Sequence, residues 1–434
     1  MTNRNSTPAD AVLVAIDMSK HRQEILLERP EGGRRRRMTV MASKVDYDRL
    51  TNDLAAIGRP IVVGFEATGN YHRTLAHRLL TAGFELRLIS SVALARTREA
   101  LHNGWDKNDS KDAQVILHML QIGATQRYVD PLAAGINDLQ EMSKTHEMIS
   151  KAKTQTWHRI LTHYLPLYFP EIERFAGNSR SDWFLALLER FPTPGSMTGI
   201  GRKAFTEEAW PLVGRKVSKA RLLGDIYETA SASMALPVDD GSVAIAMFRL
   251  VIAQARSLIR QRNEIEQLAH ATLAENRDYQ LLRMIPGIGP INALTILAEA
   301  GDLRRFQHHR QFLKFCGLDL ATCQSGMFRG RTKLSKYGNA RLRRTFWMAA
   351  QVAARQRDNS FRDKLGRYMD GHDNDPDRRR KAMTALTAKM ARVAHAVIKT
   401  GTEYRPFLER AGTRWKDPSL TCREGAPQDI GVTL

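Results

Sequence analysis

Four acidic residues occupy positions where the local sequence would bring carboxylates together. Asp17 ends the first apolar run of the chain, and Glu66 directly follows a later apolar run. Asp109 and Asp112 are three residues apart at the start of a helical pattern, so both can lie on one helix face. Converging carboxylates repel one another, and Mg²⁺, a cation that takes oxygen ligands, relieves the repulsion. Two such ions about 3.5 to 4 Å apart stabilise the attacking and leaving oxygens of a phosphodiester.

Each of these carboxylates also has an ordinary structural explanation. Asp17 can cap a turn, Glu66 can lie in a loop, and Asp109 can be a helix N-cap with Asp112 favourably placed in the first turn. Asp106, three residues before Asp109, is a competing metal ligand that spacing alone does not exclude. The residues alone therefore predict a metal site and leave open which carboxylates form it.

A serine in a cationic segment is the second candidate for chemistry. Ser325 precedes Gly326, and the basic residues that follow are Arg329, Arg331, Lys333, Lys336, Arg341, Arg343 and Arg344. Cations around a hydroxyl would stabilise the charge that develops when it attacks a phosphodiester, and they are also candidate nucleic-acid contacts. From the residues alone, a turn is the more common role of a Ser-Gly pair, and Ser335 is a rival hydroxyl.

A glycine-rich segment, Ile285 to Pro290, lies between two helical patterns. This pattern is typical of a helix-hairpin-helix turn, in which Gly287 and Gly289 would let backbone N–H groups approach a phosphate. The alternative is a plain tight turn between two packed helices.

The elements that must position these residues follow from the apolar pattern. Short β-rich runs predict strands at residues 11–16, 24–28, 38–42, 60–65 and 85–89, with helical patterns between the later ones. This order predicts an α/β domain. Long helices are predicted at residues 136–168 and 243–273, and the segment 166–242 between them carries no clear chemistry. The fold class is therefore α/β followed by a mainly α part.

Composition limits the class of protein. The 434 residues include 66 Lys and Arg against 46 Asp and Glu, a net charge of +20, and 43% are hydrophobic. This balance excludes a wholly disordered chain and favours a nucleic-acid partner. Three cysteines with irregular spacing do not form a disulfide framework or a zinc site. No apolar stretch reaches the roughly 18 residues of a membrane span, so we expect a cytoplasmic protein with no membrane partner.

Several motifs together resemble a known family, the DEDD transposases of the insertion sequence 110 type, which include the Piv-like DNA invertases. The N-terminal motifs are residues 16–20 (IDMSK), 65–71 (FEATGNY) and 107–113 (KNDSKDA). The C-terminal motifs are residues 285–290, 298–302 (AEAGD), 315–318 (FCGL), 324–326 (QSG), 335–339 (SKYGN) and 342–344 (LRR). Two features depart from the family: Asn108 stands where threonine is more common, and the segment 166–242 is longer than in compact members.

The resemblance implies a domain order. It comprises a tail at residues 1–10, a RuvC-like domain of the RNase H type at 11–135, a helical connector or coiled coil with an insertion at 136–278, a C-terminal transposase domain with a helix-hairpin-helix at 279–405, and a tail at 406–434. It also implies that Asp17, Glu66, Asp109 and Asp112 form the metal-binding tetrad and that Ser325 is the catalytic serine.

The function implied is that of a transposase or site-specific recombinase guided by a noncoding bridge RNA. It would join double-stranded target and donor DNA through Mg²⁺-dependent cleavage and a phosphoserine intermediate, in a bacterial, nucleoid-associated setting. Because the tetrad and the serine are far apart in sequence, a composite site and a homo-oligomer, dimers pairing into a tetramer, are expected. The alternatives are a RuvC-like metal-dependent nuclease or Holliday-junction resolvase without a serine intermediate, and a nonenzymatic nucleic-acid-binding protein.

Overall fold

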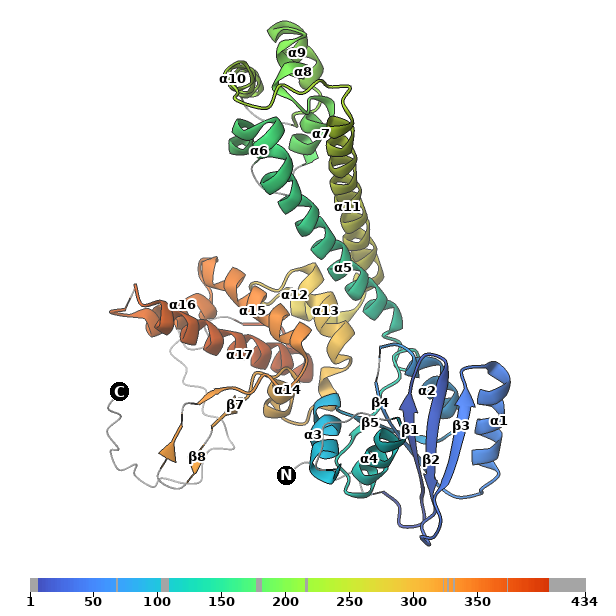
Figure 1. Ribbon diagram of the computed structural model, residues 1–434. Helices are drawn as coiled ribbons and strands as arrows, with labels where there is room; N and C mark the ends of the chain where they lie inside the picture. The colour runs from blue at the N-terminus through green and yellow to red at the C-terminus, as the bar shows by residue number, and fades with distance from the viewer. Residues whose placement is uncertain are drawn as a thin grey trace. The chain divides into compact units, whose positions relative to one another are not determined.

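The computed structural model describes residues 7–67, 69–102, 109–176, 182–214, 218–322, 324–325, 328–330, 332–372 and 374–405. The chain divides into two compact units, Met1–Asn137 and Asp138–Leu434 (Figure 1). Asp106 and Arg331, both singled out from the sequence, lie outside the described residues.

The first unit is built on a mixed six-stranded sheet. Its strands are β1 (Val12–Met18), β2 (Arg22–Glu28), β3 (Arg36–Met41), β4 (Ile61–Glu66), β5 (Glu85–Ile89) and the two-residue β6 (Gln126–Arg127), in the order β3-β2-β1-β4-β5-β6. Strands β1 to β3 pair antiparallel, whereas β4 and β5 run parallel to β1. The predicted α/β domain is present, and the apolar runs become its first five strands.

Helices cover both faces of this sheet because successive strand residues alternate in direction. Val14 and Ile16 of β1 share a core with Leu50 of α1 (Lys44–Ala55) and Leu75 of α2 (His72–Thr81). Ala15, between them, instead shares a core with residues of α3 (Ser91–His102) and α4 (Asp109–Gln121). Residues of β1 with odd numbers therefore face α4.

The basic run at residues 34–37 lies partly in a strand. Arg36 and Arg37 belong to β3, and Arg37 forms an ion pair with Glu24 of the neighbouring strand β2, whose register partner is Thr39. Pairing with a buried carboxylate holds Arg37 in the sheet, so half of this run is strand rather than loop.

The second unit begins with a pair of long helices that lie side by side, α5 (Asn137–Arg159) and α11 (Val243–Leu273) (Figure 1). Nε2 of His146 in α5 lies 3.2 Å from Oε1 of Glu266 in α11. The first helix continues through a π-helical turn at Ile160–Tyr164, so the predicted long helices are present with one irregularity.

The segment that the sequence left unexplained folds around its own core. It contains α6 (Leu165–Tyr168), a 3₁₀ turn (Pro170–Phe175), α7 (Asp182–Arg190), α8 (Pro194–Thr198), α9 (Arg202–Ala209) and α10 (Lys219–Ser231). Fully buried Phe169, Phe184 and Phe205 pack there with Phe248 of α11. The segment is thus a helical cap on the pair of long helices.

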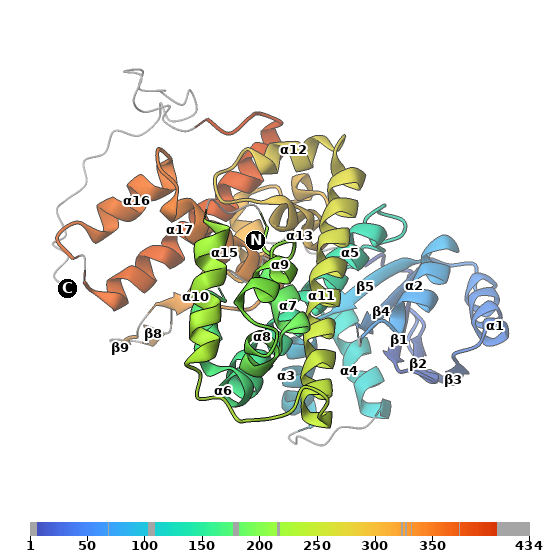
Figure 2. The same ribbon diagram turned by 90° about the horizontal axis from the view of Figure 1, so that it is seen from above.

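The C-terminal part is mainly helical, as predicted. Its helices are α12 (Arg277–Arg283), α13 (Pro290–Ala300), a 3₁₀ turn (Leu303–Arg305), α14 (His309–Phe315), α15 (Ala340–Arg355), α16 (Ser360–Met369) and α17 (Pro376–Thr400). Helices α15, α16 and α17 pack against one another (Figure 2). The described residues between α14 and α15 form the two-residue strands β7 (Leu320–Ala321), β8 (Gln324–Ser325), β9 (Phe328–Arg329) and β10 (Lys333–Leu334).

Within the described ranges, none of the helices combines the length and apolar character needed to cross a membrane.

Candidate active site

Two of the predicted carboxylates lie at the carboxyl ends of neighbouring parallel strands. Asp17 is the penultimate residue of β1 and Glu66 the last of β4. The register pairs Ile16 with Phe65, so Asp17 and Glu66 are the next residues along adjacent strands. The residues before them, Ile16 and Phe65, belong to the core on the opposite face of the sheet. Because side chains alternate along a strand, Asp17 and Glu66 lie on the face covered by α4.

Asp112 of α4 is buried beside this same face. Its carboxylate accepts a hydrogen bond of 2.6 Å from Nε of Arg98, which comes from α3. Side chains of both residues are largely buried, 2% exposed for Asp112 and 13% for Arg98. A buried carboxylate needs such a partner, because an unpaired charge in the interior is costly. Asp109 begins α4, but its side chain lies outside the described ones.

The donor set has the chemistry of a divalent-metal site. Asp17, Glu66 and Asp112 supply only carboxylate oxygens, the ligands that hard cations prefer. Among the side chains that the structure describes, no group of three His, Cys, Asp or Glu is close enough to hold a metal ion. The guanidinium of Arg98 occupies one oxygen of Asp112. The three carboxylates lie on the same side of the sheet, and the carboxylate of Asp112 is paired with the guanidinium of Arg98.

A further buried carboxylate escaped the sequence analysis. Glu24 of β2 lies directly opposite Asp17 in the antiparallel register, so both side chains are on the same sheet face. Glu24 accepts a hydrogen bond of 2.9 Å from Oγ1 of Thr39 and pairs with Arg37. The sequence did contain a signal for Glu24, because a carboxylate stands there at the start of an apolar strand and faces Asp17 across a hairpin. Arg98 gave no such signal.

Ser325 lies on the serine ribbon, which we define as residues 319–335. Strands β7 and β10 pair antiparallel at its foot, and β8 pairs with β9 farther out, with Ser325 opposite Phe328. Ser325 is exposed, and no hydrogen bond of its hydroxyl to a described residue is found. The residues alone favoured a turn at this Ser-Gly pair, and the structure places Ser325 on a short paired strand.

Two contacts hold the foot of the serine ribbon: hydrogen bonds from Arg343, and a close approach of Gly338 to Gly317. Arg343 of α15 donates from Nη1 to the carbonyl oxygens of Cys316 and Lys336, at 3.3 and 3.2 Å. Gly338 has a φ of 150°, and a Cβ there would lie 2.5 Å from the backbone nitrogen of Gly317. Only glycine permits this approach. Arg343 therefore holds the foot through Nη1, and its predicted contact with nucleic acid remains a prediction.

The rival hydroxyl, Ser335, joins the two sides of the ribbon. Its hydroxyl donates to the carboxylate of Asp319, and its backbone nitrogen donates to the carbonyl oxygen of Asp319 at 2.9 Å. Ser335 is half-buried, in contrast with Ser325. These contacts give Ser335 a structural role at the foot of the ribbon.

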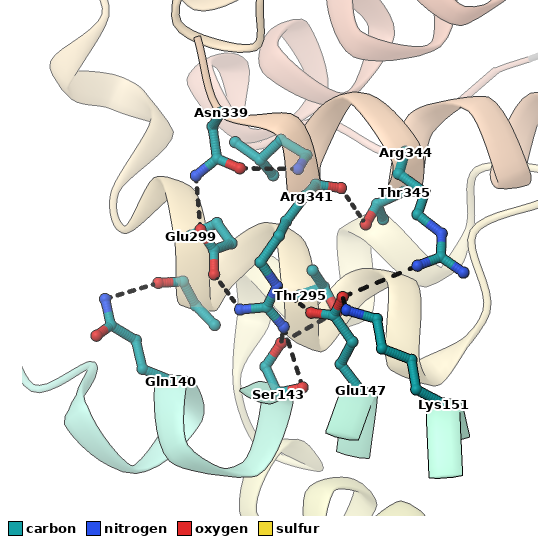
Figure 3. Close-up of polar contacts among 12 residues, drawn as sticks. Gln140, Ser143, Glu147, Lys151, Thr295, Glu299, Asn339, Arg341, Arg344 and Thr345 are labelled. Atoms are coloured by element: carbon teal, nitrogen blue, oxygen red, sulfur yellow. Dashed lines mark hydrogen bonds and ion pairs between the residues drawn. The ribbon is translucent and has the colours of Figure 1, made fainter. Parts of the chain in front are cut away.

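Arg341, predicted as a phosphate contact, is bound by partners within the fold. Its guanidinium is bound by Glu147 at 2.6 Å, by Glu299, and by the carbonyl and hydroxyl oxygens of Ser143, each at 3.0 Å (Figure 3). These partners come from α5 and α13, so Arg341 links three helices. Its donors are used internally, which leaves it poorly suited to bind a phosphate.

Glu147 at the centre of this network is held ionised. The hydrogen bond from Lys151 lowers the pKa of Glu147, partial burial opposes this shift, and the positive charge of Arg341 adds to it. Arg344 also lies near Glu147, at 3.8 Å, but is 66% exposed. Lys333 and Lys336 are exposed as well, and the side chain of Arg329 lies outside the described ones. Contacts of these residues with nucleic acid remain predictions.

The glycines of the segment 285–290 have different surroundings. Gly287 has a φ of 87°, and a Cβ there would lie 2.1 Å from the carbonyl oxygen of Ala349 in α15. Its lack of a side chain is therefore explained by helix packing. Gly289 is the N-cap of α13 and has open space around it. A phosphate contact by either glycine, and the helix-hairpin-helix itself, remain predictions.

Comparisons with known proteins match both units. A sequence model of DEDD transposases of the IS110 type matches residues 14–170, and one described as the transposase IS116/IS110/IS902 family matches residues 279–365. A probable family 20 transposase of Pseudomonas aeruginosa is 24% identical over 350 residues, which is 80% of this chain and 86% of the relative. The transposase for insertion sequence element IS1111A of Coxiella burnetii is 24% identical over 302 residues, 69% of each chain.

One solved structure, T. thermophilus RuvC in complex with Holliday junction substrate, covers 27% of this chain and 99% of its own at 11% identity. Its TM-score is 0.20, too low to bear on the fold. The matching models and relatives instead define the class of protein, a transposase of bacterial insertion sequences. Within that class, the chain belongs to the IS110-type family of DEDD transposases.

Proposed function

We propose that this transposase is a DNA recombinase that forms a covalent phosphoserine intermediate at Ser325 and is guided by a bridge RNA. The observation that carries the proposal is the exposed hydroxyl of Ser325 on a clamped ribbon with basic neighbours such as Lys333. The same chain also carries carboxylates on one sheet face, so it has both a nucleophile and candidate metal ligands.

In the proposed step, Oγ of Ser325 attacks the scissile phosphorus of double-stranded donor or target DNA. The Oγ–P bond forms as the P–O3′ bond breaks, and the serine proton ends on the departing 3′ oxygen. The bond energy is kept in the phosphoserine ester, so the free 3′ hydroxyl of the other DNA can reverse the step and complete the exchange. Basic side chains near the ribbon stabilise the charge on the phosphate oxygens.

The carboxylates Asp17, Glu66, Asp109 and Asp112 are the proposed ligands of Mg²⁺. When bound, such an ion supplies Lewis acidity toward phosphate oxygens. The RuvC-like, RNase H type assignment of the first unit belongs to this proposal and is supported by the strand order β3-β2-β1-β4-β5. The net charge of +20 supports simultaneous binding of DNA and RNA by an oligomer, a dimer or tetramer.

A trapping experiment tests the serine. Wild-type protein, incubated with cognate DNA, RNA and Mg²⁺ and then denatured, is expected to retain a protein–DNA adduct, and Ser325→Ala is expected to lose it. Ser231→Ala, which removes an exposed hydroxyl of α10 outside the ribbon, is the matched control and should keep the adduct. Cut DNA ends without any adduct would identify a metal-dependent nuclease or junction resolvase instead. Sequencing the RNA that copurifies with the protein tests the guide.

A further inference from the structure

A pocket of about 330 Å³ opens in the second unit beside the foot of the serine ribbon. Leu318 and Leu334, one from each side of the foot, form its apolar wall. Small-ligand pockets usually measure about 300 to 1,000 Å³, so this one suits a single small, flat group rather than an extended ligand.

The second wall is one face of α15, at its N-terminal end. Arg343, Arg344 and Trp347 line the pocket there, together with Ala340 of the first turn. Among the described residues that line it, none is acidic. Two guanidinium groups next to a helix N-terminus favour an anion, and the indole of Trp347 offers an aromatic surface. Arg344 lies 3.8 Å from Glu147 and is largely exposed, so this pairing is weak.

The third wall supplies a hydrogen-bond acceptor. Thr384 and Thr387 of α17 donate their hydroxyl hydrogens to the carbonyl oxygens of Arg380 and Met383, at 2.9 and 2.8 Å. With its hydrogen used within the helix, the hydroxyl of the partly exposed Thr384 can offer only a lone pair to a ligand, whereas Thr387 is buried. The pocket therefore combines an anion site, an aromatic surface and an acceptor for an amino or hydroxyl group.

We propose that this pocket binds one unstacked nucleotide of a nucleic-acid strand, with its phosphate toward Arg343 and Arg344 and its base toward Trp347. A nucleotide has an anion, a flat aromatic ring and N–H or O–H donors, which the three walls match one by one. The proposal rests on the proposed function only in taking nucleic acid as the partner. Unstacked nucleotides of DNA and of RNA share this chemistry, and the experiment separates them.

The test uses full-length protein with Ser325→Ala, without divalent metal, so that no strand is cut. The probes are a single-stranded DNA and an RNA of one sequence, each with 2-aminopurine at successive positions. Thr384→Leu narrows the pocket and removes a hydroxyl acceptor without removing a charge, and Arg344→Gln removes a pocket charge. Arg355→Gln, an exposed arginine at the other end of α15, is the matched control.

We expect Thr384→Leu to weaken binding of the single strand by about tenfold, the loss of one stacked base, and to abolish the 2-aminopurine signal at one position. The salt dependence of binding should not change in this variant, because no charge is lost. Arg344→Gln should weaken binding more than Arg355→Gln. Weaker binding of the DNA, the RNA or both strands supports the proposal. The strand that is affected is the one that supplies the nucleotide.

If Thr384→Leu and Arg344→Gln bind both strands with the same affinity as Arg355→Gln, the proposal is overturned. The two proposals fail separately. Absence of a Ser325 adduct with the pocket signal retained refutes the phosphoserine mechanism alone, whereas an adduct formed by protein that shows no pocket signal refutes the pocket alone.

Discussion

The acidic face and the serine ribbon hold their candidate groups by opposite means. Asp17, Glu66 and Asp112 sit on a sheet and a helix whose apolar residues, such as Ala15 and Ile116, form one core. Ser325 sits on strands of two residues, secured by polar contacts and glycines at the foot of the ribbon. Carboxylates that would share a cation thus depend on core packing, whereas the nucleophile depends on a few hydrogen bonds.

The largest effect is expected on the acidic side, from Arg98→Gln. This variant leaves the buried carboxylate of Asp112 without its cation, and breaking such a pair costs about 3 to 5 kcal/mol of unfolding free energy. Urea denaturation followed by circular dichroism measures the loss. The double variant Arg98→Gln with Asp112→Asn removes both charges and should recover part of it. A single variant as stable as wild type would show that the pair does not hold this face together.

The same variant sharpens the question of the metal. If a divalent cation binds Asp112, then Arg98 competes with it, and Arg98→Gln should bind Mn²⁺ more tightly than wild type. A ligand that binds only the folded state raises stability with its concentration, so the variant should gain more thermal stability from Mn²⁺. Calorimetric titration with the metal alone gives the affinity directly. Equal gains in both proteins would rule out competition by Arg98.

On the ribbon side, the largest effect is expected from Gly338→Ala. A Cβ at Gly338 would lie 2.5 Å from the backbone nitrogen of Gly317 at a φ of 150°, a strain of about 3 kcal/mol. Gly366→Ala in α16 is the matched control, because nothing lies within 4 Å of its Cβ position. That change should stabilise the helix by about 0.5 to 1 kcal/mol. Similar urea midpoints for the two variants would contradict a tight crossing at the foot.

The strand ends were open to prediction from sequence, but the long-range polar partners were not. Asp17 and Glu66 follow apolar runs, and parallel strands bring their ends to one sheet edge. Arg341 shows the limit, since its spacing suggested a phosphate contact and its partners Glu147 and Glu299 are far away in the chain. The pairing of Arg98 with Asp112 is of the same kind. Local patterns report which face a residue takes, and only the folded chain shows which charges meet there.

A smaller effect is expected from Arg343→Gln, which removes the charged donor to Cys316 and Lys336. Hydrogen bonds from charged donors contribute about 1.5 kcal/mol or more, so the foot should open more often with little change elsewhere. The thiol of Cys316 reports this opening, because it is fully buried and burial raises its pKa. In a Cys323→Ser, Cys422→Ser background, alkylation of Cys316 should be faster in Arg343→Gln. An unchanged alkylation rate would mean that Arg343 does not clamp the foot.

The smallest effect on stability is expected from Ser325→Ala, the variant that should abolish the adduct. Ser325 is exposed and has no described hydrogen-bond partner, so its loss should change the unfolding free energy by no more than about 0.5 kcal/mol. Asp112→Asn, by contrast, should lower both stability and activity, since the carboxylate is buried against Arg98. Urea denaturation and the trapping assay, run on both variants, separate a group that acts only in chemistry from one that also holds the fold. A marked loss of stability in Ser325→Ala would place the serine among the contacts that build the ribbon and would remove the contrast between the two sides.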